Sequence, residues 1–302
     1  IWKQIESFAG YAFAKGHSAS YAVESYQSLY LKAHYPLAYL TACINNFGGY
    51  YRTEIYVHEA RRFGAQIEAP CINEGAYSCV LQEKRLILGF NLVAGIEVVL
   101  AEQILIERTQ NGEFTNLENL LKRIYIPLEQ LSILIRIGAL RSFKQPRKAL
   151  LWQAHFYHNK QLRPHQKLEL FEVKQQTQQL PELEEHPLES TFEQFELLGF
   201  PLCDPFTLLL EPLPTSFVLV QDFSDYIAKE VLTVGYLVSI KQTKTNKGDT
   251  MCFGTFLDPS GDFLDTVHFP QINERYPFYG KGVYRITGKI TEEFSYLTLE
   301  VS

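Results

Sequence analysis

The chain has 302 residues, 46% of which are hydrophobic, and a formal net charge of −6. This composition is sufficient to bury the cores of two or three domains. No stretch is long and apolar enough to span a bilayer, so we expect a soluble, cytoplasmic protein rather than a membrane protein. The 5 cysteines show no CxxC or other metal-ligand spacing, and such an odd, scattered set suits buried thiols in a reducing cytoplasm better than a disulfide framework.

The first residues, IWKQIESFAGYAF, resemble the interior of a folded domain in their pattern of apolar and aromatic residues, so we expect a fragment of a longer protein. Residues 18–47 place apolar and aromatic side chains three and four positions apart, which predicts helix, with a break or a new start at Pro36. A further helix is predicted over residues 52–63, ending at Gly64. The amino-terminal region is therefore predicted to be helical.

Residues 65–90 change to short alternating runs, which indicate a small hairpin or an irregular bridge. Residues 91–143 return to short helices joined by tight glycine turns at Asn111-Gly112 and at Gly138. Thr115 is the predicted N-cap of the middle helix, and Pro127 the predicted start of the last one.

The basic residues are concentrated at the end of this helical block. Residues 122–148 contain seven cations against the single acid Glu129. Such a local excess is the signature of a surface that binds a polyanion, although a solvated helix face would give the same count. We expect these residues to contact DNA: Lys122, Arg123, Arg136, Arg141, Lys144, Arg147 and Lys148.

The last part of the chain has a different texture. Residues 144–190 are polar and rich in Gln, Glu and Pro, which predicts a flexible linker. After a short helix near residues 191–200, five alternating segments rich in β-branched and aromatic residues follow, with a helical insert between the third and the fourth. This pattern fits a small OB-type barrel. The fold class is thus multidomain, α then β.

Four segments occur in a fixed order along the chain. They are FAGYAFAKGHSASYAVESYQSLYLKAHYP at 8–36, HEARRFGAQIEAPCIN at 58–73, IRIGAL at 135–140 and EQFELLGFPLCDP at 193–205. Together they resemble the carboxy-terminal portion of the DNA polymerase III alpha subunits, the C-family of bacterial replicative polymerases. The resemblance implies that residues 1–74 are the end of a fingers domain, 75–150 a tandem helix-hairpin-helix region, 151–228 an acidic linker with a clamp-binding segment and 229–302 an OB-fold domain.

The resemblance also assigns the chemistry. It implies that Lys15, His17 and Ser18 bind the triphosphate of an incoming nucleotide. The alternative is that the Lys-x-His pair is exposed on the surface without a binding role, which is the more frequent case for such a pair alone. The parent enzyme would perform DNA-directed DNA synthesis with Mg²⁺ and dNTPs, using carboxylates of an upstream palm domain. No Asp-x-Asp pair occurs here, so we expect this fragment to contain no catalytic residue or cofactor and to be inactive alone.

Some residues depart from the family pattern. Ala14 and Gly16 stand where the family's fingers motif has Asn and Ser, and the first hairpin reads Gly95-Ile96-Glu97 instead of Gly-apolar-Gly. A glycine hairpin binds phosphate through bare backbone amides, and Glu97 adds bulk and negative charge at that place. The second hairpin unit, residues 127–140, is therefore the expected phosphate site.

Two further contacts are implied. The segment Lys167-Leu168-Glu169-Leu170-Phe171 resembles the pentapeptide that docks the alpha subunit onto the sliding clamp, with Leu168, Leu170 and Phe171 as an apolar hook. The alternative is an amphipathic segment folded onto its own domain. In the barrel, Lys241, Lys244 and Lys247 are expected to contact single-stranded DNA.

Tyr236, Phe253 and Phe269 of the barrel could stack on bases if they point outward, but aromatic residues of strands more often belong to the core. The leading hypothesis is thus a polymerase fragment that binds primer–template and single-stranded DNA, the sliding clamp and other replisome subunits. Its rival is a protein-interaction scaffold of the replisome that has lost contact with DNA. The sequence does not separate a main replicase from a specialised paralogue.

Overall fold

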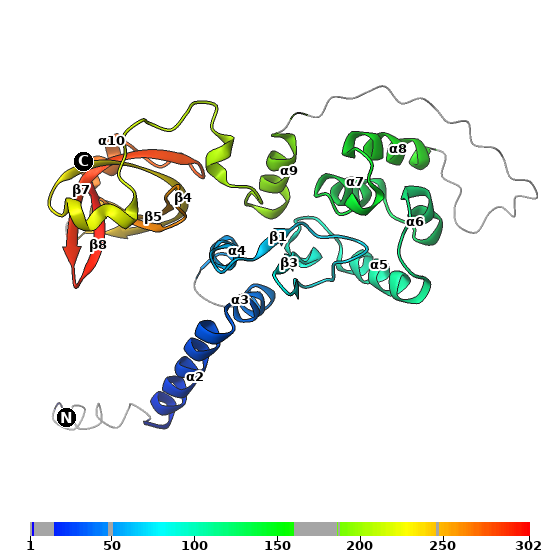
Figure 1. Cartoon of the computed structure of the whole chain (residues 1–302), viewed down its shortest axis with the longest axis horizontal. Helices are drawn as coiled ribbons and strands as arrows, with labels where there is room; N and C mark the ends of the chain where they lie inside the picture. Colours follow the sequence, from blue (N-terminus) through cyan, green and yellow to red (C-terminus); the bar gives the residue numbers. More distant parts are fainter. Residues whose placement is uncertain (1, 3–14, 48–50, 160–185, 187, 246–247) are drawn as a thin grey trace, which may run out of the picture. The chain divides into compact units, whose positions relative to one another are not determined.

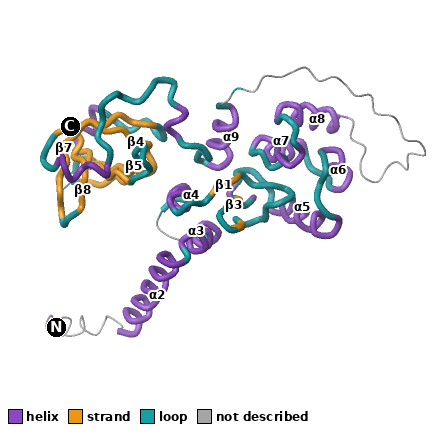
Figure 2. The backbone as a smooth tube through the Cα atoms, in the orientation of Figure 1, coloured by secondary structure: helices purple, strands orange, loops and turns teal. Residues whose placement is uncertain are grey.

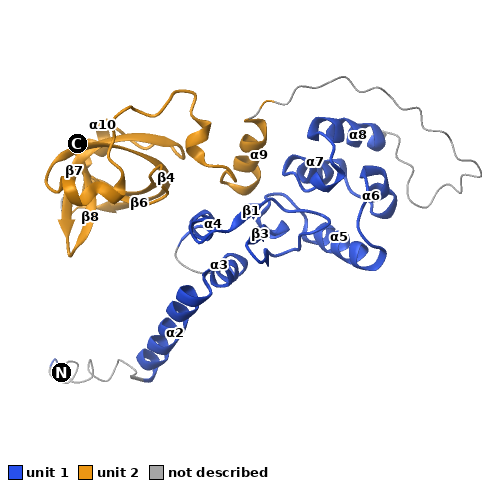
Figure 3. Cartoon of the chain, viewed as in Figure 1, with its two compact units in different colours: residues 1–185 blue, residues 186–302 orange. Residues whose placement is uncertain are grey.

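The structure is a computed structural model that describes residue 2 and residues 15–47, 51–159, 186, 188–245 and 248–302. It divides into two compact units, residues 1–185 and residues 186–302 (Figure 3). The first unit is mostly helical and the second is built on a β-barrel (Figures 1 and 2). This confirms the predicted order of a helical region followed by a barrel.

The first unit begins with the long helix α2, Lys15–His34, followed by α3, Pro36–Asn45, and α4, Thr53–Arg62. Pro36 occupies the first turn of α3, where a proline costs no hydrogen bond, so the break predicted at this residue is confirmed. The contact between α3 and α4 buries Leu40, Ile44, Ile55 and Val57. Gly64 follows α4 with φ +86, and such a left-handed residue commonly ends a helix.

A small three-stranded sheet connects α4 to the next helices. Its strands are β1, Gln66–Glu68, β2, Val80–Gln82, and β3, Arg85–Ile87, in the order β1-β3-β2. The pair β2–β3 is antiparallel and forms the hairpin predicted for residues 65–90, while β1 pairs with β3 in parallel. Ile72, Leu86, Ile87 and Leu88 are almost fully buried, so this sheet belongs to the core of the unit.

The remaining helices of the unit form a helical block. They are η1, Phe90–Leu92, α5, Val98–Asn111, α6, Leu117–Arg123, α7, Leu128–Arg136, η2, Arg141–Phe143, and α8, Arg147–Asn159. Asn116, not the predicted Thr115, is the N-cap of α6, because its side chain accepts a hydrogen bond from the Asn119 amide at 2.8 Å. The helix α8 runs across residue 150, the expected end of this block.

The second unit contains α9, Glu189–Leu198, η3, Pro205–Leu208, η4, Val220–Tyr226, and a closed five-stranded barrel. Its strands are β4, Glu230–Lys244, β5, Thr250–Leu257, β6, Phe263–His268, β7, Val283–Glu293, and β8, Tyr296–Val301. The order β4-β5-β6-β8-β7 closes through the β4–β7 pair. The helix α10, Pro270–Arg275, lies between the third and fourth strands, as in OB folds.

Barrel closure leaves no free sheet edge, and the interior is filled by side chains from every strand. Phe223 of η4 covers one part of this core and is 1% exposed. Asp258 joins η4 to the β5–β6 turn, because its carboxylate accepts the amides of Val220, Ser260 and Asp262. In the described ranges, no helix is long and apolar enough to cross a membrane.

Candidate nucleic-acid interface

The second hairpin lies between α7 and α8. Gly138 has φ +81, a conformation in which its amide donates to Ile135 O at 3.0 Å and the Ala139 amide to Leu134 O at 2.9 Å. These bonds end α7 with a left-handed residue, which explains why the sequence needs glycine here. The chain then turns through η2 into α8, where the Arg147 guanidinium donates to Arg136 O at 3.3 Å. The hairpin therefore places the start of α8 beside the end of α7.

Arg123 and Arg141, two of the seven predicted DNA-binding cations, each contact several groups within the protein. The Arg123 side chain is 15% exposed, and its Nε donates to the Glu107 carboxylate at 2.9 Å. The same guanidinium donates to Glu107 O at 3.0 Å and Gly112 O at 2.9 Å, and lies 4.2 Å from the centre of the Phe114 ring. Arg141 donates to Pro70 O at 2.7 Å and to Glu68 Oε2 at 3.1 Å. Both arginines thus contribute to the fold.

Of the other five cations, Lys122 and Lys144 are exposed, whereas Arg136, Arg147 and Lys148 are half-buried and have contacts within the protein. Lys122 is exposed and pairs with Glu118 at 2.8 Å, one turn away on α6. Lys144 is exposed in a left-handed conformation just after η2, and Arg147 and Lys148 follow in the first turn of α8. That first turn contains no acidic residue, so two positive side chains lie at the positive end of the helix dipole.

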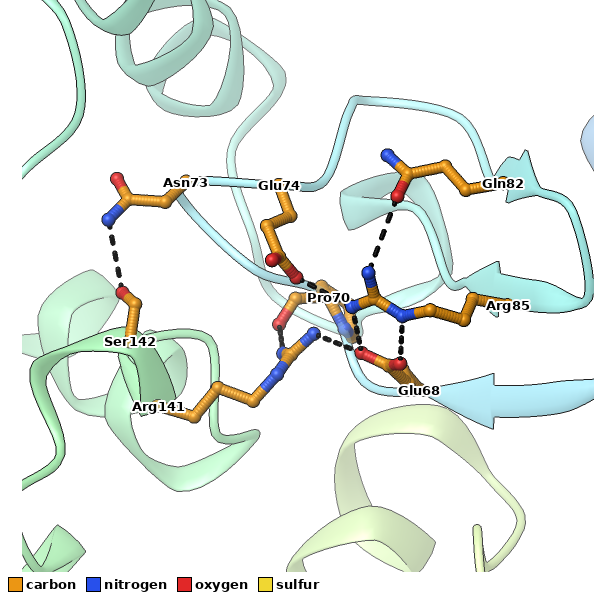
Figure 4. Close-up of polar contacts among 8 residues, drawn as sticks. All are labelled: Glu68, Pro70, Asn73, Glu74, Gln82, Arg85, Arg141 and Ser142. Atoms are coloured by element: carbon orange, nitrogen blue, oxygen red, sulfur yellow. Dashed lines mark hydrogen bonds and ion pairs between the residues drawn. The ribbon is translucent and has the colours of Figure 1, made fainter.

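A charge network holds the second hairpin against the small sheet (Figure 4). Arg85 donates to Glu68 through Nε at 2.6 Å and Nη2 at 3.0 Å, and to Glu74 at 2.9 Å. Arg141 approaches the same Glu68 carboxylate from η2. The hydrogen bonds from Arg85, with a smaller contribution from Arg141, lower the pKa of Glu68 below its ordinary value. Glu68 therefore joins the sheet to the hairpin region.

Asn73 adds an uncharged connection between the same parts (Figure 4). Its Nδ2 donates to Phe114 O at 2.8 Å and to Ser142 Oγ at 3.1 Å, and its Oδ1 accepts the Phe114 amide at 2.9 Å. Sequence reasoning missed Glu68, Asn73 and Arg85, because their partners lie up to 73 positions away in the chain. No local motif or residue spacing in the sequence predicts contacts between residues so far apart.

The first hairpin is closed by a side chain of the same unit. Gly95 has φ +81, as a hairpin glycine should, but the Glu97 amide donates to Gln130 Oε1 at 3.0 Å. The Gln130 amide group in turn donates to Gly95 O at 2.8 Å, and Gln130 is only 6% exposed. A buried glutamine of α7 thus occupies the amide that a phosphate would need.

The fingers-motif residues lie at the start of α2. Lys15 is the first residue of the helix, and its side chain lies outside the described part. His17 is exposed, with its ring centre 5.8 Å from that of Tyr21, and Ser18 is half-buried. No acidic residue lies in the first turn of α2.

The barrel presents part of its predicted contact surface. Lys241 and Lys244 of β4 are exposed, and Lys241 pairs in register with Phe253 of β5, which is 39% exposed. Phe269 is 42% exposed, but Tyr236 is 2% exposed, so Tyr236 is a core residue and the outward alternative is wrong for it. Lys247 and the hook residues Leu168, Leu170 and Phe171 lie outside the described residues.

Across the described ranges, no three His, Cys, Asp or Glu side chains gather in a way that could hold a metal ion. We assign no catalytic step to these residues.

A family model described as a helix-hairpin-helix motif matches residues 64–150. The error-prone DNA polymerase of Bdellovibrio bacteriovorus is 28% identical over 319 residues, which cover 96% of this chain and 29% of the relative. The DNA polymerase III subunit alpha of Borreliella burgdorferi is 29% identical over 320 residues, covering 96% of this chain and 27% of the relative. The chain is homologous to bacterial DNA polymerase III alpha subunits and error-prone DNA polymerases.

The homology to these polymerases extends over nearly the whole chain, but the chain spans less than a third of the relatives' length. The error-prone DNA polymerase of Mycobacterium tuberculosis is 32% identical over 157 residues, which cover 51% of this chain and 14% of the relative. Relatives with both names occur, so the homology does not separate a main replicase from an error-prone paralogue. A solved nucleic-acid-binding lipoprotein of Klebsiella pneumoniae has a TM-score of only 0.24, which supports no conclusion.

Proposed function

We propose that this chain is a DNA-binding part of a bacterial C-family polymerase and that the α7–α8 hairpin binds the backbone of primer–template DNA. The observation that carries the proposal is the group of cations at this hairpin, inside the segment that matches the helix-hairpin-helix motif. We define the hairpin cluster as Lys144, Arg147 and Lys148, with Arg136 beside it. The parent enzyme performs DNA-directed DNA synthesis.

The chemistry of the hairpin cluster suits this task. Cations that neutralise phosphates release counterions, and the resulting affinity does not depend on base sequence. A polymerase has to hold every sequence that it copies, so contact with the backbone is the appropriate mode of recognition. Because Gln130 occupies the first hairpin, we propose that the second hairpin supplies the main backbone contact of this region.

The barrel is proposed to contact single-stranded DNA. Lys241 and Phe253 are register partners on neighbouring strands, so a cation lies beside an exposed ring on the outer face. An aromatic surface with nearby cations binds unpaired bases without sequence preference. The eight basic and nine acidic residues of the segment 229–302 nearly cancel, which favours weak binding.

The amino-terminal residues and the linker complete the proposal. Lys15, His17 and Ser18 would bind the nucleotide triphosphate at the start of α2, together with a palm domain that supplies the catalytic metals. Residues 168–171 would dock on the sliding clamp and bring the chain to other replisome subunits. The four functional regions predicted from the sequence, and a cytoplasmic location beside the chromosome, belong to this proposal.

A titration tests the proposed function directly. The purified chain is titrated against fluorescently labelled primer–template and single-stranded DNA at low and moderate salt, with anisotropy as the readout. We expect binding to both, with an affinity for primer–template that falls steeply with salt because phosphate contacts dominate. Absence of binding to any DNA at low salt would support the rival function, a protein-interaction scaffold.

The clamp contact has its own experiment. Changing Leu170 and Phe171 together to Ala is expected to abolish capture of the chain by immobilised sliding clamp, because an apolar hook provides most of the affinity of such short segments. The matched control is Leu180→Ala, an apolar truncation later in the linker that should leave capture unchanged. Equal capture of the double variant and the unmodified chain would show that these two residues are not the hook.

A further inference from the structure

A small aromatic pocket lies between α3 and α4 of the first unit. It is lined by Ile44 and Phe47 at the end of α3 and by Tyr51, Arg52 and Tyr56 at the start of α4. Its volume is about 190 Å³, below the 300–1,000 Å³ typical of pockets for whole small-molecule ligands. The pocket therefore has room for a single planar ring rather than a complete cofactor.

Two rings of this pocket are unusually exposed. Phe47 is 65% exposed and Tyr51 is 56% exposed, while the Tyr51 and Tyr56 ring centres lie 6.4 Å apart in an edge-to-face arrangement. Phe47 also has φ +47, a left-handed conformation that is costly for a bulky side chain and that glycine usually provides at a helix end. Strained residues of this kind are concentrated at binding and switching sites.

The charge at the pocket mouth is positive. Arg52 is exposed, and among the described residues no carboxylate forms an ion pair with its guanidinium. Arg52 is also the N-cap of α4 and makes no side-chain capping hydrogen bond, and the Glu54 carboxylate in the same first turn is buried, so Arg52 supplies the exposed charge at the pocket mouth. A ligand that matches the pocket therefore combines a flat ring with a nearby anion.

We propose that this aromatic pocket binds one unpaired base of single-stranded DNA, with the base against Phe47 and Tyr51 and a flanking phosphate at Arg52. Stacking on aromatic rings beside a cation is the usual way in which proteins hold single strands without reading their sequence. The proposal rests on the proposed DNA-binding function and adds a second single-strand contact in the first unit. An aromatic side chain of a partner protein is the competing occupant.

The test uses the whole chain and a fluorescein-labelled oligothymidylate. Phe47→Ala and Tyr51→Ala are each expected to weaken binding by about tenfold, the usual loss when one stacking ring is removed. Tyr51→Phe keeps the ring and should bind nearly as well as the unmodified chain. Arg52→Ala should flatten the salt dependence of single-strand binding by about 0.7 of a logarithmic unit per decade, the value for one phosphate.

Crosslinking locates the contact independently. An oligonucleotide containing 5-iododeoxyuridine is irradiated with the chain, and we expect crosslinks to Phe47 or Tyr51. Unchanged affinity of the alanine variants, crosslinks only elsewhere, or an equal loss in Tyr51→Phe and Tyr51→Ala would each overturn the proposal. A titration with blunt duplex DNA distinguishes failure of the pocket proposal from failure of the proposed function. If the chain still binds duplex DNA, only the pocket proposal is refuted. If the chain binds no form of DNA, the proposed function is refuted as well.

Discussion

Changing Lys144, Arg147 and Lys148 together to Ala is expected to weaken primer–template binding by roughly a hundredfold or more at moderate salt. Each cation that neutralises a phosphate contributes about 0.9 to the logarithmic slope of affinity against salt, so the slope should fall by about 2.7. The measurement is a series of anisotropy titrations across salt concentrations. Arg147 also donates to Arg136 O at 3.3 Å, so circular dichroism and thermal unfolding check that the variant keeps the fold.

The control for this triple variant removes the same charge elsewhere. Lys84, Lys229 and Lys289 are exposed and lie outside the hairpin cluster, so their joint change to Ala should leave the salt slope nearly unaltered. An equal loss of affinity in both triple variants would mean that only the net charge matters. An unaltered slope in the hairpin variant would mean that the cluster is a solvated helix face.

Arg123→Ala is expected to destabilise the chain by roughly 2 to 4 kcal/mol, because the change removes a charged donor from a network that is mostly shielded from water. The loss leaves the Glu107 carboxylate without this partner and the carbonyls of Glu107 and Gly112 without their donor. It also removes the cation from the Phe114 ring. Urea unfolding followed by circular dichroism measures the effect.

Two variants serve as controls for Arg123. Lys122→Ala changes the neighbouring cation, which is 73% exposed and forms a surface pair, so its effect should stay within about 0.5 kcal/mol. Arg123→Lys keeps the charge but loses the planar guanidinium that donates several hydrogen bonds. Its loss of unfolding free energy should lie between those of Lys122→Ala and Arg123→Ala. If Arg123→Ala left stability unchanged and instead weakened DNA binding, the residue would be a phosphate contact, as its sequence context suggests.

The difference between Arg123 and its neighbours shows what charge counting misses. The cluster at residues 122–148 was visible in the sequence, because seven cations in so short a stretch are uncommon. The internal partners of Arg123 and Arg141 were not visible, since Glu107 and Glu68 are positioned by tertiary packing. A sequence therefore predicts where positive charge gathers better than it predicts which cations remain available to a ligand.

The barrel was predictable for a different reason. Alternation of apolar residues and turn signals are local properties, and they marked all five strands and the helical insert. The exposure of single side chains was harder to predict. Tyr236 lies in a part of β4 that is buried continuously from Thr233 to Val238, just before an irregularity in its pairing with β5. A strand covered on both faces loses the alternation that would tell inward from outward residues.

The closure of the first hairpin by Gln130 limits what a single substitution can change there. Replacing Gln130 with a small residue would release the Glu97 amide but would at the same time bare the Gly95 carbonyl, whose oxygen repels a phosphate. Glu97 would still carry its negative charge at the same turn. An anion-binding hairpin at this place therefore requires changes at both Gln130 and Glu97, and no single substitution creates one.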